Sequence, residues 1–520
     1  MKKKILGFVV LVMAFSLLFS NSLGVMAQEP QEGGDLRIAI GADPESLDPL
    51  YAQSSPAAMV MVHMMETLFE MTPDGDIVPL LAEDYDVSDD GLVYDLYLRE
   101  GVEFHDGEPF NAEAVKFNLE RLLDQGAVYS FLIDAITEIE VIDEYTIRIA
   151  TDEPFAPILA HLSHDFISMI SPAAIDADDP SQDAGENIVG TGPFKMDGWN
   201  RGEAVLMTRN DDYWGDNAYV DTFSVLIVPE ESTRVVMLET GEAHAIMNVP
   251  ARDVSRLEEN PDLTVENVPS LRTLYVGLNN HREPFDDVRV RKAMNYAVDS
   301  EAIVEHIIDG AGRPSDAPIS PDIFGYSGQE IYQHNPDRAR ELLAEAGYED
   351  GLEVEFYYPV GRYPMDQTIS QAIQSQLADV GIDANMTTME WATYLEVVGG
   401  NEPEDVEHDM YFLGWGTVTG DADYGLYALF HSDEWAPYGN NWHFGDHEGV
   451  DELLHEARIT PDPDIRQDLY AEAIELIWDD APWIFLHSIS QLNGVRNEVA
   501  GLIHHPREHI EAKRAYFIND

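Results

Sequence analysis

Residues 352–389 read LEVEFYYPVGRYPMDQTISQAIQSQLADVGIDANMTTM and decide the fold class of this chain. Apolar side chains alternate from Leu352 to Tyr358, which is the period of a β-strand. They then recur at helical spacing from Ile369 to Val380, until Gly381 ends the helix. A second strand begins at Ile382. The segment therefore predicts a βαβ unit, in which a crossover helix joins two parallel strands.

The neighbouring segments continue the alternation of helices and strands. Asn335 is a predicted N-cap, Pro336 occupies the first helical position, and Gly347 ends that helix. An apolar strand is predicted at 410–413. Nearer the N-terminus, residues 92–98 alternate like a strand, and Asn111 caps a helix. No fixed-period repeat occurs, and the length of 520 residues suggests about three domains. The fold class predicted is α/β.

The βαβ unit also predicts where a ligand binds. In an open doubly wound sheet, ligands lie in the crevice outside the carboxyl ends of the strands. The loop 359–364 follows the first strand of the unit, and the loop 414–424 follows the strand at 410–413. We therefore expect these two loops to form the binding site.

The two loops carry one guanidinium, two carboxylates and several aromatic rings. Arg362 has the shape to hold a carboxylate with two parallel hydrogen bonds. The alternative is that Arg362 is a surface arginine in a very acidic chain. Trp415 either stacks on a ligand or packs in the core. Tyr363 and the carboxylates of Asp421 and Asp423 complete the candidate site.

The composition excludes several classes of protein. The chain has 98 Asp and Glu against 29 Lys and Arg, a formal net charge of −69, and no cysteine. Phosphate contacts need basic patches, so nucleic-acid binding is not expected. Without cysteine there are no disulfides, thiolate metal sites or thiol nucleophiles. Because molar salt screens such self-repulsion, we expect a halophilic protein, with an acidic habitat or a merely acidic surface as alternatives.

The first residues are predicted to be a targeting segment. Lys2 to Lys4 precede an apolar run at 5–19, and Val25 and Ala27 stand at the positions where signal peptidase requires small residues. We expect a signal peptide at 1–27 and an exported protein, periplasmic or on the outer face of the cytoplasmic membrane. An uncleaved membrane anchor is the alternative.

Motifs for catalysis and metal binding are weak. No P-loop, nucleophile elbow or zincin helix occurs, and with so many acidic residues, pairs of carboxylates carry no information. Histidines gather at 443–447 and at 504–509 in spacings that match no zinc motif, so we interpret them as solvated loops. We predict no enzyme activity, no metal and no cofactor.

The chain resembles the extracytoplasmic solute-binding proteins of family 5, which serve peptide and nickel ABC importers. The motifs that carry the resemblance span the chain and are, in order, residues 43–49 (DPESLDP), 98–107 (LREGVEFHDG), 189–194 (VGTGPF), 209–215 (RNDDYWG) and 288–294 (VRVRKAM). The resemblance implies a type II periplasmic binding protein whose two lobes close around a solute. It also implies a membrane permease as partner and a monomeric state.

The resemblance implies the following domain organisation. Lobe I would comprise 28–75, 191–270 and 484–520. An extra subdomain would span 76–190, on the N-terminal lobe, and lobe II would span 271–483.

The resemblance also bears on the solute. Peptide binders of the family hold the ligand carboxylate with an arginine that matches Arg362. Their aspartate for the ligand amine matches Val418, so simple dipeptide binding is in doubt, and residues 414–423 look closer to the glutathione-binding branch. Asp421 or Asp423 would replace that anchor or cap the next helix. We expect a peptide-like solute, with nickel or a metal chelate, haem or an oligosaccharide as alternatives. A secreted hydrolase and a sensory or chaperone-like receptor are the competing classes.

Overall fold

A computed structural model of the chain describes residues 30–176, 179–185, 187–389, 391–399, 407–432 and 448–518. Within these ranges no helix has the length and apolarity needed to cross a membrane. The predicted signal peptide, residues 1–27, lies outside the described residues, and so do the histidines at 443–447.

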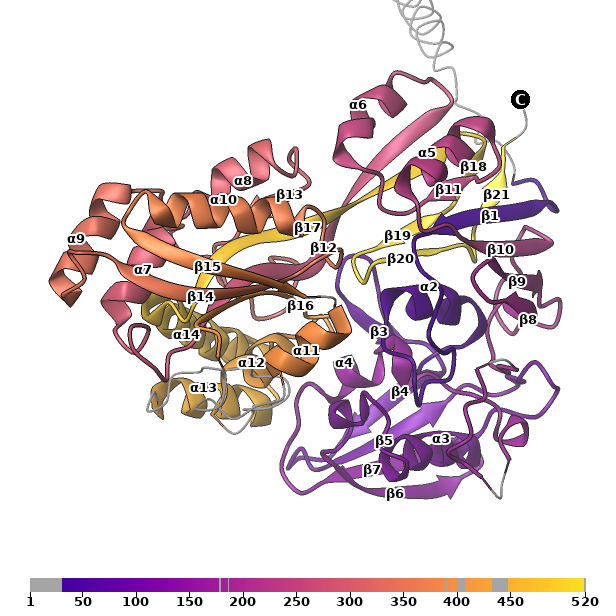
Figure 1. Ribbon diagram of the computed structural model, residues 1–520. Coiled ribbons are helices and arrows are strands. Elements are labelled where there is room, and N and C mark those ends of the chain that lie inside the picture. Colours follow the sequence, from indigo (N-terminus) through magenta and orange to yellow (C-terminus); the bar gives the residue numbers. More distant parts are fainter. Residues whose placement is uncertain are drawn as a thin grey trace, which may run out of the picture.

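A mixed sheet of eleven strands runs through the molecule (Figure 1). Its path is β15 (Ile382–Met389), β14 (Leu352–Pro359), β16 (Met410–Gly416), β12 (Leu263–Leu278), β17 (Trp483–Arg496), β11 (Ala245–Ile246), β1 (Asp35–Ile40), β10 (Thr222–Ile227), β9 (Ala204–Arg209) and β8 (Phe194–Asn200), with β13 (Gly312–Pro314) pairing β17. β14 is parallel to both β15 and β16. This confirms the βαβ unit predicted at 352–389.

Two long strands join the two ends of this sheet. β12 has 16 residues and β17 has 14, and they pair along most of their length. We call the body around β1 and β8 to β11 lobe I, and the body around β14 to β16 lobe II (Figure 1). The pairing of β12 with β17 shifts register between Pro269 and Thr273, at the passage from lobe I to lobe II. The lobes are therefore connected by continuous strands.

Helices cover both faces of the sheet in lobe II. They are α7 (Val288–Ala297), α8 (Ser300–His306), α9 (Pro336–Ala346), α10 (Asp366–Ala378), α11 (Trp391–Gly399), η4 (Asp423–Tyr427), α12 (Ala428–Phe430), α13 (Glu448–Ile459) and α14 (Pro463–Asp480). α7 to α10 share one apolar core with the sheet, and α11 to α14 share another. The predicted caps of α9 are confirmed, because the Asn335 side chain accepts a hydrogen bond from the Arg338 amide and Gly347 has a φ of 97°.

A separate four-stranded antiparallel sheet forms the inserted domain, drawn in purple in Figure 1. Its order is β4 (Ala82–Val87), β5 (Val93–Leu98), β7 (Thr146–Thr151) and β6 (Ile136–Asp143), and its helices are α3 (Ala112–Asp124), α4 (Ile158–Leu162), η1 (Ser130–Leu132), η2 (Asp165–Ile167) and η3 (Pro172–Ala174). The predicted strand and the helix capped by Asn111 are both present. The inserted domain has its own apolar core.

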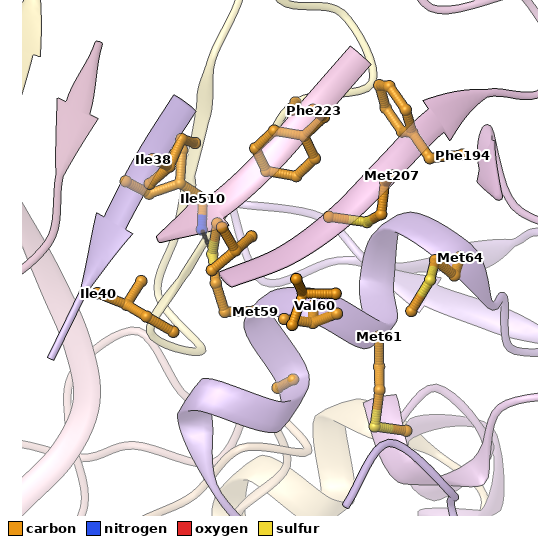
Figure 2. Packing of buried hydrophobic residues seen from close by; sticks show 14 of the residues in the cluster. Ile38, Ile40, Met59, Val60, Met61, Met64, Phe194, Met207, Phe223 and Ile510 are labelled. Atoms are coloured by element: carbon orange, nitrogen blue, oxygen red, sulfur yellow. Dashed lines mark hydrogen bonds between the residues drawn. The ribbon is translucent and has the colours of Figure 1, made fainter. Parts of the chain in front are cut away.

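Helix α2 (Ser55–Met64) is buried in the core of lobe I. Its Met59 and Val60 lie beneath the sheet, close to Ile510 (Figure 2). The rest of lobe I comprises α5 (Glu231–Thr240), α6 (Ala251–Glu258), β18 (Val499–Ala500), β19 (Ile503–His505), β20 (His509–Glu511) and β21 (Tyr516–Phe517), and the hairpin of β2 (Phe69–Met71) and β3 (Ile77–Pro79) reaches toward lobe II. The packing of α2 against β20 brings the first turn of α2 close to the β19–β20 turn.

Candidate functional site

The two loops predicted to form the site lie side by side. Both follow parallel strands, β14 and β16, so they emerge from the same edge of the sheet. The buried hydroxyl of Tyr363 accepts a hydrogen bond from the Gly414 amide (2.9 Å) and donates one to the Gly414 carbonyl (3.2 Å). Tyr363 thereby ties the loop after β14 to the end of β16.

The guanidinium of Arg362 is exposed at this edge. It lies about 5 Å from the ring centroids of Tyr363 (5.0 Å) and Trp391 (5.1 Å). The Arg362 amide donates to Asp366 (2.9 Å), which fixes the loop, but within the described residues its guanidinium makes no hydrogen bond or ion pair. Arg362 therefore presents a guanidinium that no described residue holds by a hydrogen bond or an ion pair.

Trp415 is half-buried and belongs to an aromatic series. Its indole N–H donates to the Tyr424 carbonyl (3.2 Å), and the two ring centroids are 5.2 Å apart. Tyr424 in turn stacks on Phe131 of the inserted domain, with 5.9 Å between centroids. The rings therefore extend from the predicted site in lobe II to the inserted domain.

Asp421 and Asp423 are buried and paired with arginines of later helices. Asp421 accepts a hydrogen bond from Nη2 of Arg466 (2.9 Å), and Asp423 is held by Arg458 through Nε (2.8 Å) and Nη2 (3.0 Å). Burial alone would raise the pKa of Asp423, but Arg458 more than offsets it and lowers that pKa. Each of the two carboxylates is therefore bound by an arginine of the same lobe.

The predicted cap function is seen only in part. The Asp421 carboxylate accepts a hydrogen bond from the Asp423 amide (3.0 Å), just before η4. Val418 is half-buried, packs against the inserted domain and accepts a hydrogen bond from Arg507 Nε at its carbonyl (2.6 Å). No charge is present at the Val418 position, and whether either aspartate binds a solute stays a prediction.

Glu508 is a member of the site that the sequence did not predict. It lies in the β19–β20 turn with a left-handed backbone (φ 69°), and its carboxylate accepts hydrogen bonds from Arg272 Nε (3.0 Å) and from the hydroxyls of Ser270 (2.9 Å) and Ser55 (3.0 Å). Burial alone would raise the pKa of Glu508. Arg272, joined by Arg362, more than offsets this and lowers the pKa to about 2. Glu508 is therefore an ionised group of lobe I that is close enough to Arg362 to interact with it electrostatically.

The histidines at 504–509 do not form a solvated loop, which corrects our interpretation. His505 and His509 are buried, and with Glu511 they bring three ligand-type atoms within 4.8 Å of one another. Both ring nitrogens of His505 are already engaged, by the Arg507 amide (3.1 Å) and the Met71 carbonyl (2.9 Å). The ammonium of Lys513 lies 3.1 Å from Glu511. These contacts engage His505 and Glu511 within the protein, whereas Nδ1 of His509 has no hydrogen-bond partner among the described residues.

Comparison with known proteins identifies the family. Residues 76–437 match the model of the bacterial extracellular solute-binding proteins, family 5, middle region. The chain belongs to this family.

Known relatives extend the family 5 match over nearly the whole chain. The glutathione-binding protein GsiB of Salmonella typhi is 34% identical over 453 residues, which cover 86% of this chain and 88% of that protein. The solved structure of the ABC transporter-associated periplasmic binding protein DppA from Helicobacter pylori, in complex with peptide STSA, has a TM-score of 0.81 and 30% identity, and covers 94% of this chain and 99% of that one.

A further solved structure is that of the dipeptide-binding protein from Pseudoalteromonas sp. SM9913 in complex with Met-Leu. It has a TM-score of 0.81 and 25% identity, and covers 93% of this chain and 100% of that one. The predicted fold class is confirmed: this family 5 protein is an α/β periplasmic binding protein of type II, with two lobes and an inserted domain.

In this family 5 protein, all three bodies meet around the predicted site. Arg507 of lobe I reaches the Val418 carbonyl of lobe II and also donates to the Ser163 carbonyl of the inserted domain (2.7 Å). The inserted domain contacts lobe II directly, because the Ala156 amide donates to the Arg458 carbonyl (2.8 Å). The loops of the site are thus enclosed by contacts from both lobes.

Proposed function

We propose that this protein captures a peptide-like solute that carries a carboxylate and delivers it to the permease of an ABC importer. Arg362 is the observation that carries the proposal. In a chain with 98 acidic and 29 basic residues, an exposed arginine with no carboxylate partner among the described residues is unexpected. A ligand carboxylate would complete it with charge-assisted hydrogen bonds. The relatives named above for glutathione, peptide STSA and Met-Leu support a solute of this class.

Binding would couple to closure of the lobes. The proposed boundaries assign 28–75, 191–270 and 484–520 to lobe I, 76–190 to the inserted subdomain and 271–483 to lobe II. The boundary at 270 falls at the register shift between β12 and β17, where the ladder is already interrupted. A solute that bridges Arg362 and the groups of lobe I shifts the population toward the closed form, which docks on the permease.

The proposal includes an exported binding protein without enzyme activity. The family is described as extracellular, and residues 1–27 have the pattern of a signal peptide. The acidic composition supports a halophilic setting. A monomer that carries no cofactor is the form that we propose.

A thermal-shift panel on the purified protein in molar salt tests the proposal. The ligands are glutathione, di-, tri- and tetrapeptides, the same peptides with amidated C-termini, nickel with histidine, and oligosaccharides. A ligand at 100 times its Kd adds about 2.7 kcal/mol to stability, which raises the Tm visibly. We expect shifts with peptide acids and none with their amides.

Two outcomes would contradict the proposal in different ways. Equal Tm shifts with peptide acids and with their amides would mean that the protein does not recognise the C-terminal carboxylate. A response to nickel-histidine or to sugar alone would keep the binding protein and replace the solute class. Release of product from a peptide or glycan would point instead to a hydrolase.

A further inference from the structure

A cavity lies between the inserted domain and lobe II. Its volume is about 450 Å³, and Tyr424 and Phe131 form part of its wall. Tyr424 is the ring that also contacts Trp415, at 5.2 Å between centroids. The cavity is therefore lined in part by the predicted binding loop 414–424 itself.

At the wall of this cavity, His161 has a ring nitrogen without a hydrogen-bond donor among the described residues. His161 is 3% exposed, and its Nδ1 lies 2.8 Å from the Leu132 carbonyl, so Nδ1 carries the proton as donor. This leaves a lone pair on Nε2, which has no hydrogen-bond partner among the described residues. The nearest charged group is Oδ2 of Asp423, at 3.7 Å. Because Asp423 already accepts hydrogen bonds from Arg458, Nε2 of His161 is the acceptor of this pair that lacks a donor among the described residues.

Negative charge also predominates in the lining of the cavity. Asp134, Asp152 and Glu153 of the inserted domain line it, and in the described part of the chain none of them has an arginine or lysine within ion-pair distance. Arg458 is the arginine that lines the same cavity, and it is already bound to Asp423. The field inside the cavity therefore attracts a cation.

A metal ion does not fit this arrangement. Among the described residues, the only set of three ligand-type atoms within 4.8 Å is the cluster of His505, His509 and Glu511, which lies elsewhere. No three of the described imidazole and carboxylate groups of this cavity are therefore close enough to coordinate one ion together, and the guanidinium of Arg458 is already bound to Asp423. A larger cation with several N–H donors can contact more than one of these carboxylates at once.

The aromatic walls favour an organic cation. Phe155 and Tyr427 line the cavity and already accept a guanidinium, since the Arg458 carbon lies 3.2 Å from the Tyr427 centroid and 5.5 Å from that of Phe155. Tyr424 and Phe131 add further ring surface. The walls therefore contribute cation–π attraction in addition to the carboxylates.

We propose that this cavity is a subsite for an ammonium or guanidinium group of the solute. The inference rests on the proposed function, because it assumes a peptide-like solute in the adjoining loops. The cationic group is held by Asp134 and Asp152 and donates to Nε2 of His161, while the ligand carboxylate binds Arg362. The site thereby selects solutes with opposite charges at their two ends, or with a basic side chain.

Isothermal titration calorimetry with matched tripeptides tests the subsite, at the lowest salt that keeps the protein folded. The pairs are Lys-Ala-Ala and norleucine-Ala-Ala, each with a free and an acetylated N-terminus, so that the side-chain and N-terminal cations are separated. We expect the wild type to bind the peptide that carries the relevant cation at least tenfold more tightly than its neutral counterpart. Asp134→Asn and Asp152→Asn should each reduce that preference to threefold or less, with unchanged affinity for the neutral peptide.

Glu138→Gln is the matched control, because Glu138 is an exposed carboxylate of the same domain that does not line the cavity. It should keep the wild-type preference. Neutral peptides that bind as tightly as cationic ones would overturn the subsite and leave the peptide function intact. Absence of binding to every peptide would overturn both proposals. Binding of nickel chloride alone that is lost in Asp134→Asn would replace the organic cation by a metal.

Discussion

The loop after β14 and the loop after β16 both lie at the carboxyl ends of parallel strands. They differ in whether their charged side chains are already paired within the protein. The first presents Arg362 exposed and without an ion pair among the described residues, whereas the second holds Asp421 and Asp423 buried against arginines. Position at the carboxyl ends of parallel strands therefore brings the candidate side chains to one edge of the sheet. Whether a charged side chain there is available to a ligand depends on partners that come from distant helices.

Removing one partner of a buried ion pair should produce the largest loss of stability. Both side chains of the Asp421–Arg466 pair are 7% exposed, so Asp421→Ala leaves an uncompensated guanidinium in the core. We expect a loss of about 3–5 kcal/mol in the free energy of unfolding, measured by urea denaturation. Combining it with Arg466→Met should recover much of that loss. A loss below about 1 kcal/mol would mean that Asp421 is available to a ligand after all.

The opposite behaviour is expected of Arg362. Arg362→Ala should leave the free energy of unfolding within about 0.5 kcal/mol of the wild type, because its guanidinium is exposed. It should weaken binding of peptide acids by about 2–5 kcal/mol, measured by calorimetry. Arg340→Ala, an exposed arginine of α9, is the control and should change neither quantity. Unchanged affinity in Arg362→Ala would refute the carboxylate clamp.

The pH dependence of stability tests the role of Glu508, the ionised carboxylate near Arg362. Its pKa is about 2 in the folded protein against an ordinary value of 4.5. A carboxyl whose pKa is lowered by folding stabilises the folded state above its unfolded pKa, and this contribution disappears as the pH falls from about 4.5 through about 2. The shift corresponds to about 3 kcal/mol at neutral pH. Glu508→Gln should therefore be less stable than the wild type at pH 7 and equally stable near pH 2. A difference that is constant with pH would contradict the assignment.

The smallest effect is expected at Asp366, which fixes the exposed loop without touching a ligand. Its buried carboxylate accepts hydrogen bonds from the amides of Arg362 (2.9 Å) and Tyr363 (3.3 Å). Asp366→Ala should cost about 1–2 kcal/mol of stability. It should also weaken peptide binding less than Arg362→Ala does, because the guanidinium is still present but less well placed. Equal losses of affinity in the two variants would show that the loop conformation, not the charge, dominates.

The sequence predicted those features whose causes are local. The caps of α9 at Asn335 and Gly347 and the strand alternation from Leu352 involve contacts a few residues apart, so the pattern carries the information. The partners of the site are not local. Asp423 and Arg458 are 35 residues apart, and Arg272 and Glu508 are 236 apart. No spacing rule reaches across such separations, so the sequence indicates neither Glu508 nor the arginines that bind Asp421 and Asp423.

The position of β17 in the chain has a consequence for how the molecule is made. This strand pairs with β11, β12 and β13 in the middle of the main sheet, yet it begins only at Trp483. At about 5–20 residues per second, synthesis of the preceding chain takes on the order of 25–100 s, during which neither lobe has its shared central strand. Pairings of such high contact order form late and slowly. The main sheet of a nascent chain therefore stays incomplete until β17 has been made.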